Sequence, residues 1–114
     1  MNTTTKIQHP DTHFRVMNLI HKNPDISQRE LAKQAGISLG SMHYCLKALT
    51  LKGWLKAGNF KSNPDKSVYL YLLTPEGIKQ KSQLAIGFLK RKRQEYTQLK
   101  REIDSLSEEL HDED

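Results

Sequence analysis

The strongest constraint in this sequence is a pair of short helices, each with its own start and stop signal. Ser27 and Glu30 have the spacing of a capping box, in which the serine hydroxyl accepts the Glu30 amide proton and the Glu30 carboxylate accepts the Ser27 amide proton. Gly36 supplies the left-handed conformation that ends a helix, Ser38 caps the next one, and Gly53 closes it. Two short helices joined by a glycine turn of this length predict a helix-turn-helix.

The flanking segments predict how this motif is completed. Thr74 is a good helix cap, and Pro75 suits a first helical turn. The expected elements are a first helix at about 12–22 capped by Asp11 or Thr12, strands at 54–61 and 67–73 joined by a polar loop at 62–66, and a long helix from Pro75 to Leu110. The predicted fold class is therefore mainly α with a small β-hairpin: a winged helix-turn-helix followed by one long C-terminal, coiled-coil helix.

The second helix of the motif, at 39–52, has two faces of different character. Apolar side chains at i, i+3, i+4 and i+7 are expected to face the core: Met42, Cys45, Leu46 and Leu49. The other face is mostly short, polar or aromatic, which suits a helix in the major groove better than an ordinary solvated surface. The residues expected to contact bases or phosphates here are Ser38, Leu39, Gly40, Ser41, His43, Tyr44 and Lys47.

Two further segments are expected to hold DNA phosphates. The amides at the start of the first motif helix, together with Ser27, Gln28 and Arg29, form a potential anion site because backbone N–H groups point outward there. The loop between the strands carries Lys61, Asn63 and Lys66, which are expected to reach the adjacent backbone or minor groove.

A heptad repeat runs along the last helix. The apolar positions are Leu89, Tyr96, Leu99, Ile103, Leu106 and Leu110, with Ala85 and Lys92 as weaker members and Gly87 as a possible interruption. So small a domain cannot cover this stripe, and the expected partner is a second copy of the chain. The acidic end of the helix, at 108–112, favours an antiparallel pair slightly, since it would approach the basic run at 90–93 of the other copy.

The charge is distributed unevenly along the 114 residues. Residues 1–74 hold ten Lys and Arg against four Asp and Glu, a net charge of +6, whereas residues 75–114 hold eight against nine, a net charge of −1. A basic front half suits a phosphate backbone as partner. There is no apolar run long enough for a membrane span, and the lone Cys45 allows no internal disulfide, so we expect a cytoplasmic protein.

Other chemistry is not predicted. His9 and His13 have the spacing of a helical metal pair, but Pro10 lies between them and no further ligands are recognisable, so we expect no metal site and no cofactor. Cys45 is expected to be a buried, unreactive thiol. The basic run at 90–93 is expected to pair with acids four residues away, such as Glu95. No nucleophile–base pair, phosphate loop or carboxylate dyad is present, so no enzyme is predicted.

Residues 14–77 resemble the MarR family of bacterial transcriptional regulators. The resemblance rests on the segments 26–32 (ISQRELA), 35–38 (AGIS), 46–49 (LKAL), 52–55 (KGWL) and 73–77 (LTPEG). Within the family, 41–49 and 69–77 are similar to a subgroup associated with exopolysaccharide gene clusters. The family's usual longer N-terminal helix and second C-terminal helix are missing, so its small-molecule pocket is expected to be absent or reduced, and no effector is predicted.

Together these features predict a homodimeric regulator, with repression as the expected mode of action, that binds double-stranded DNA at a pseudo-palindromic operator. The expected parts are a flexible N-terminus at 1–10, the DNA-binding domain at 11–74, the dimerisation helix at 75–110 and an acidic tail at 111–114. The main alternative is a protein-interaction adaptor that uses the same fold without sequence-specific DNA binding. RNA binding is a weaker alternative, because the aromatic pattern of a single-strand reader is missing.

Overall fold

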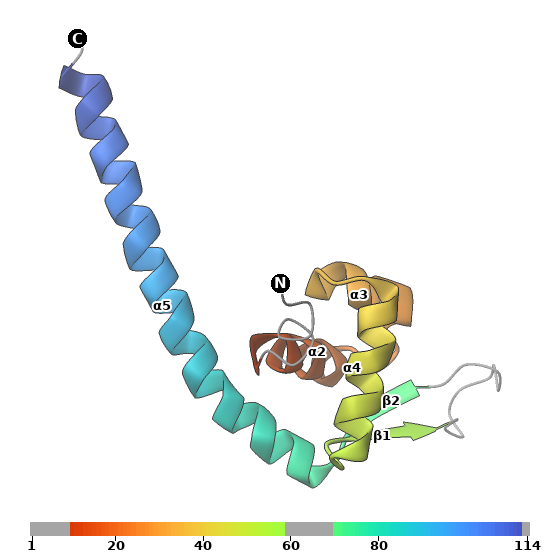
Figure 1. Ribbon diagram of the computed structural model, residues 1–114. Helices are drawn as coiled ribbons and strands as arrows, with labels where there is room; N and C mark the ends of the chain where they lie inside the picture. Colours follow the sequence, from red (N-terminus) through yellow and green to blue (C-terminus); the bar gives the residue numbers. More distant parts are fainter. Residues whose placement is uncertain (1–9, 59–69, 113–114) are drawn as a thin grey trace.

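The computed structural model describes residues 10–58 and 70–112 (Figure 1). Its elements are α2 (Pro10–Lys22), α3 (Gln28–Ala35), α4 (Leu39–Leu51), β1 (Leu55–Gly58), β2 (Leu70–Leu73) and α5 (Pro75–Asp112). The three shorter helices and the hairpin pack into one body, and α5 extends from it (Figure 1). This arrangement confirms the predicted fold class, a mainly α winged helix-turn-helix with a small hairpin and one long C-terminal helix.

Several predicted boundaries shift by a few residues. Helix α2 begins at Pro10 rather than at about residue 12, because proline has no N–H to satisfy and its fixed φ suits the first helical position. Asp11 therefore lies in the first turn and is not a cap. Strand β1 begins at Leu55, one residue after the predicted start, since the Trp54 amide donates to the Leu49 carbonyl at 3.0 Å. The rest of the predicted hairpin, at 59–69, lies outside the described residues.

The core is built where α2, α3, α4 and β1 meet. Its most deeply buried side chains are Val16, Met17, Ile20, Leu31, Met42, Cys45, Leu46, Leu49 and Leu55. All four residues of α4 that the sequence pattern placed inward are among them, which confirms that prediction. Burial of a large aliphatic side chain contributes about 1.5–3 kcal/mol, so this cluster fixes α4 against the domain.

A small clasp joins the end of α4, the hairpin and the start of α5. The Thr74 hydroxyl donates to the Gly53 carbonyl at 2.5 Å and accepts the Gly77 amide proton at 3.0 Å, as a helix cap does. The Thr74 amide donates to the Trp54 carbonyl at 3.0 Å. Gly77 packs so closely on the backbone of Trp54, the residue before β1, that a Cβ there would lie 2.0 Å from the Trp54 oxygen. Only glycine fits this position.

Helix α5 is continuous from Pro75 to Asp112, so the expectation that Gly87 might interrupt it is wrong. A single glycine costs a helix only about 1 kcal/mol relative to alanine, and the neighbouring Phe88 packs on Phe14 of α2 with ring centroids 4.6 Å apart. The Arg91 guanidinium also contacts α2, with its Nε donating to Asp11 Oδ1 at 2.8 Å. Beyond this junction every residue from 93 to 111 is exposed.

None of the helices in the described part of the chain is both long enough and apolar enough to cross a membrane.

We predict that Gly77→Ala lowers the free energy of unfolding by about 1–3 kcal/mol, because the added methyl group collides with backbone rather than with a movable side chain. The matched control is Gly40→Ala in α4, where an added Cβ meets nothing within 4 Å and should stabilise the helix by about 0.5–1 kcal/mol. Chemical denaturation monitored by Trp54 fluorescence measures both. Equal effects of the two substitutions would contradict the clasp.

Candidate nucleic-acid interface

The outer face of α4 presents a compact polar and aromatic surface. Ser38 caps the helix, and its Oγ accepts the Ser41 amide proton at 3.1 Å and donates to the Ser41 Oγ at 3.0 Å. Gly40, His43 and Lys47 are exposed, Tyr44 is half exposed, and Leu39 is 38% exposed. The predicted outer-face residues therefore share one surface, opposite the buried side of the same helix. Ser41 is half-buried, so it is the least available of the set.

A shallow groove runs between this face and the hairpin. It is lined by His43, Lys47, Thr50, Leu51, Ala57 and Tyr71. Ala57 and Tyr71 face each other across the sheet, since they are partners in the antiparallel register. Sequence reasoning did not include these two strand residues. The spacing of Tyr69 and Tyr71 in the sequence was the available signal, but the helix that faces Tyr71 could be identified only from the fold.

The start of α3 is capped as predicted, but only one half of the capping box forms. The Glu30 amide donates to Ser27 Oγ at 3.0 Å, whereas the Glu30 carboxylate accepts from Gln34 Nε2 at 2.8 Å instead of returning to the Ser27 amide. A partner four residues on lies on the same helical face, which explains the choice. Arg29 is exposed and Gln28 is half-buried beside these amides. The predicted loop contacts Lys61, Asn63 and Lys66 lie outside the described residues.

The Cys45 side chain is fully buried in the core cluster. Burial raises the pKa of the Cys45 thiol to about 11, and the nearby positive charge of Lys52 offsets this only in part. The thiolate is the reactive form of cysteine, so this thiol is unreactive at neutral pH. Among residues 10–58 and 70–112, no three His, Cys, Asp or Glu side chains are grouped as metal ligands. His13 is buried in α2, and His9 lies outside the described residues.

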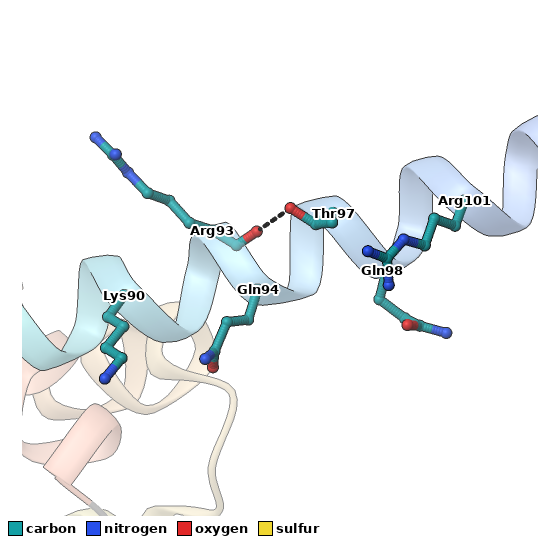
Figure 2. A pocket seen from close by; sticks show the side chains of 6 residues that line it. All are labelled: Lys90, Arg93, Gln94, Thr97, Gln98 and Arg101. Atoms are coloured by element: carbon teal, nitrogen blue, oxygen red, sulfur yellow. Dashed lines mark hydrogen bonds between the residues drawn. The ribbon is translucent and has the colours of Figure 1, made fainter.

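The basic run on α5 divides its side chains among different partners. The predicted pairing of the run with Glu95 is made by Lys92 at 2.9 Å, at a spacing of three residues and not four. Arg91 binds Asp11, 80 residues away along the chain, and not an acid of α5. A shallow polar hollow on the helix surface is lined by Lys90, Arg93, Gln94, Thr97, Gln98 and Arg101 (Figure 2). Lys90 and Gln94 extend from the same side of the helix in this view.

Comparison of sequences matches one part of the chain to a family model. Residues 10–56 match the family model described as winged helix-turn-helix DNA-binding. This match covers α2, α3, α4 and the start of β1. The chain has no match among curated proteins.

Solved structures of regulators share the fold. The Multiple Antibiotic Resistance Repressor, MarR, is 30% identical, with 75% of this chain and 61% of that chain covered and a TM-score of 0.60. The repressor CouR, bound to a 23-mer DNA duplex, is 21% identical over 95% and 84%, with a TM-score of 0.61. FabT of Streptococcus pneumoniae, in complex with DNA, is 19% identical over 90% and 76%, with a TM-score of 0.52. The chain thus spans less than two thirds of the MarR repressor.

We predict that Cys45→Ser lowers the free energy of unfolding by about 1–3 kcal/mol, because the substitution buries a polar hydroxyl among the apolar side chains of the core. The control is Leu51→Ser on the same helix, whose side chain is 79% exposed and whose loss should change stability by less than about 0.5 kcal/mol.

This cost should also depend on pH. The folded-state pKa of Cys45 lies above the ordinary value of 9.0, so the thiol contributes stability below pH 9 and loses it as pH rises toward 11. Denaturation of both proteins across this range should show the cost of Cys45→Ser shrinking. A native protein whose thiol reacts at pH 8 as fast as the unfolded chain would contradict the buried position.

Proposed function

We propose that this protein is a sequence-specific DNA-binding transcriptional regulator of the MarR type that acts as a repressor. The observation that carries the proposal is the outer face of α4, where His43, Tyr44 and Lys47 are exposed on a helix whose other side is locked into the core. A rigid helix with short polar and aromatic side chains fits the major groove, and the domain matches a winged helix-turn-helix DNA-binding family.

In this proposal the contacts divide into two groups. His43 and Tyr44 read base edges, whereas Lys47, the amides and side chains of Ser27, Gln28 and Arg29, and the loop residues Lys61, Asn63 and Lys66 hold phosphates. Leu39, Gly40 and Ser41 let the start of α4 approach the bases closely. DNA-bound neighbours of the same fold, CouR and FabT, support a duplex as the partner.

The second part of the proposal is a homodimer formed through α5. The exposed apolar side chains Leu89, Tyr96, Leu99, Ile103, Leu106 and Leu110 are each 52–67% exposed in the single chain. Their burial would contribute about 1.5–3 kcal/mol each, a strong drive toward a partner. A two-fold dimer would match a pseudo-palindromic operator, with residues 11–74 as the DNA-binding domain and 75–110 as the dimerisation helix.

A finer assignment rests on the sequence alone. Segments 41–49 and 69–77 resemble the subgroup associated with exopolysaccharide gene clusters, and we propose that the protein belongs to that subgroup.

The DNA contacts can be tested by substitution. His43→Ala and Tyr44→Ala should reduce discrimination between operator and random DNA by about 1–3 kcal/mol, because a base contact is lost. Lys47→Ala should weaken binding to all sequences equally and lower the salt dependence of log affinity by about one unit, because a phosphate contact is lost. The control is Arg101→Ala, which removes an exposed charge far out on α5.

Fragments selected from genomic DNA supply the operator, and fluorescence anisotropy at several salt concentrations measures affinity. If random duplex competes as well as the selected operator, the chain is an interaction adaptor or a non-specific binder, and the regulator proposal is wrong.

The dimer can be tested with Leu99→Lys combined with Leu106→Lys. This variant should sediment as a folded monomer and bind operator much more weakly, because two apolar contacts are replaced by facing charges. The control is Gln94→Lys combined with Gln98→Lys, which adds the same charge to the hollow of Figure 2, outside the apolar stripe. A wild-type protein that sediments as a monomer at micromolar concentration would overturn this part of the proposal.

A further inference from the structure

The charges that flank the apolar stripe of α5 are sorted by sign. Because α5 is unbroken, one heptad register applies along its length, with Leu89, Tyr96 and Ile103 at a positions and Leu99 and Leu106 at d positions. The position that follows d holds Arg93 and Lys100, the basic flank. The position that precedes a holds Glu95, Glu102 and Glu109, the acidic flank. The stripe therefore has a basic border on one side and an acidic border on the other.

This sorting distinguishes the two ways in which a second copy can pair. In a parallel pair, the acidic flank of each helix meets the basic flank of the other, and Glu95 faces the partner's Lys100. In an antiparallel pair, each flank meets its own kind, so glutamates approach glutamates and Lys100 approaches a basic residue of the partner. Two opposite-charge contacts form in the first arrangement, and only like-charge contacts form along the flanks in the second.

The attraction that would favour an antiparallel pair is weakened by the structure. That attraction depends on contacts between the basic run at 90–93 of one helix and the acidic end at 108–112 of the other. Arg91 is instead bound to Asp11, and Lys92 contacts Glu95. Lys90 follows an a position of the heptad and lies outside the a and d positions of the stripe, and it lines the hollow with Arg93 and Gln94 (Figure 2). Arg93, the remaining member of the run, lies on the basic flank, which in an antiparallel pair meets the partner's basic flank and not its acidic one.

The flank residues that would pair are accessible. Lys100 contacts Asp104 at 3.2 Å, and Lys92 contacts Glu95 at 2.9 Å, within the helix. The side chains of Lys100 and Glu95 remain 61% and 62% exposed. Exposed pairs of this kind contribute only about 0.3–0.5 kcal/mol, so a partner helix can exchange them for contacts across the seam.

We propose that two copies of this chain pair through α5 in parallel and in register, with Glu95 of each binding the partner's Lys100. This proposal rests on the homodimer proposed above and specifies its orientation. It replaces the antiparallel arrangement that the total charge of the helix ends favours. It places both winged domains at the same end of the paired helices, with the acidic tails together at the other end. Mutual repulsion of those tails acts only at the exposed terminus, where salt screens it.

A cysteine at position 106 tests the orientation. In a parallel pair Leu106 meets the partner's Leu106, so Leu106→Cys should form an intermolecular disulfide under mild oxidation. In an antiparallel pair whose two apolar stripes overlap, Leu106 lies opposite the partner's Tyr96 or Leu89. The two cysteines of Leu106→Cys would then be too far apart to form a disulfide. Gln98→Cys, outside the stripe, and the wild type with its buried Cys45 are the controls and should remain uncrosslinked.

Sedimentation of the same proteins separates the two proposals. A monomeric wild type would remove the homodimer itself, whereas a dimer in which Leu106→Cys does not crosslink would leave the homodimer standing and overturn the parallel orientation.

A charge substitution provides an independent test. Lys100→Glu should weaken self-association about tenfold in a parallel pair, because two attractive contacts become repulsive. Adding Glu95→Lys to the same chain should restore it. The control Lys90→Glu makes the same charge change outside the seam and should have little effect. Unchanged or tighter association of Lys100→Glu is the result expected of an antiparallel pair and would overturn the proposal.

Discussion

The clasp around Thr74 is the contact on which the rest of the architecture depends. Through one hydroxyl and one amide, Thr74 joins the turn after α4, the Trp54 carbonyl just before β1 and the first turn of α5. Because Gly77 lies against the backbone of Trp54, α5 leaves the domain in a fixed direction. The surface of α4 and the long helix are thereby held in a defined relation, which a dimer would need in order to place two copies of α4 on one duplex.

The direction of α5 also leaves apolar side chains of its second half exposed to water. Phe88 and Arg91 attach the first half of the helix to α2, whereas residues 93–111 in its second half are exposed. An apolar stripe on an otherwise charged helix is stable when a partner covers it and a liability when it is left in water. The proposed homodimer removes this liability, and the charged flanks give it an orientation.

Electrostatics in this chain acts through position more than through total charge. The front half is basic and the tail acidic, yet within the basic run of α5 Arg91 is bound by Asp11 and Lys92 by Glu95. Summed charge would bring opposite ends of two helices together, whereas the sorted flanks bring the same ends together. Position matters in the same way on α4. Its outer face carries few charged side chains, so hydrogen bonds and close approach would determine its contacts more than charge attraction would.

The sequence by itself determined the elements whose signals are local. Serine caps, glycine stops and the apolar spacing of α4 act over a few residues, and the helices, the buried face and the predicted contact surface follow from them. Only the tertiary structure decided what depends on distant neighbours. Gly77 is required because it meets the Trp54 carbonyl, and Arg91 finds Asp11 80 residues away. Tyr71 joins a groove with α4 for the same reason, since spacing along the chain carries no information about which elements meet in space.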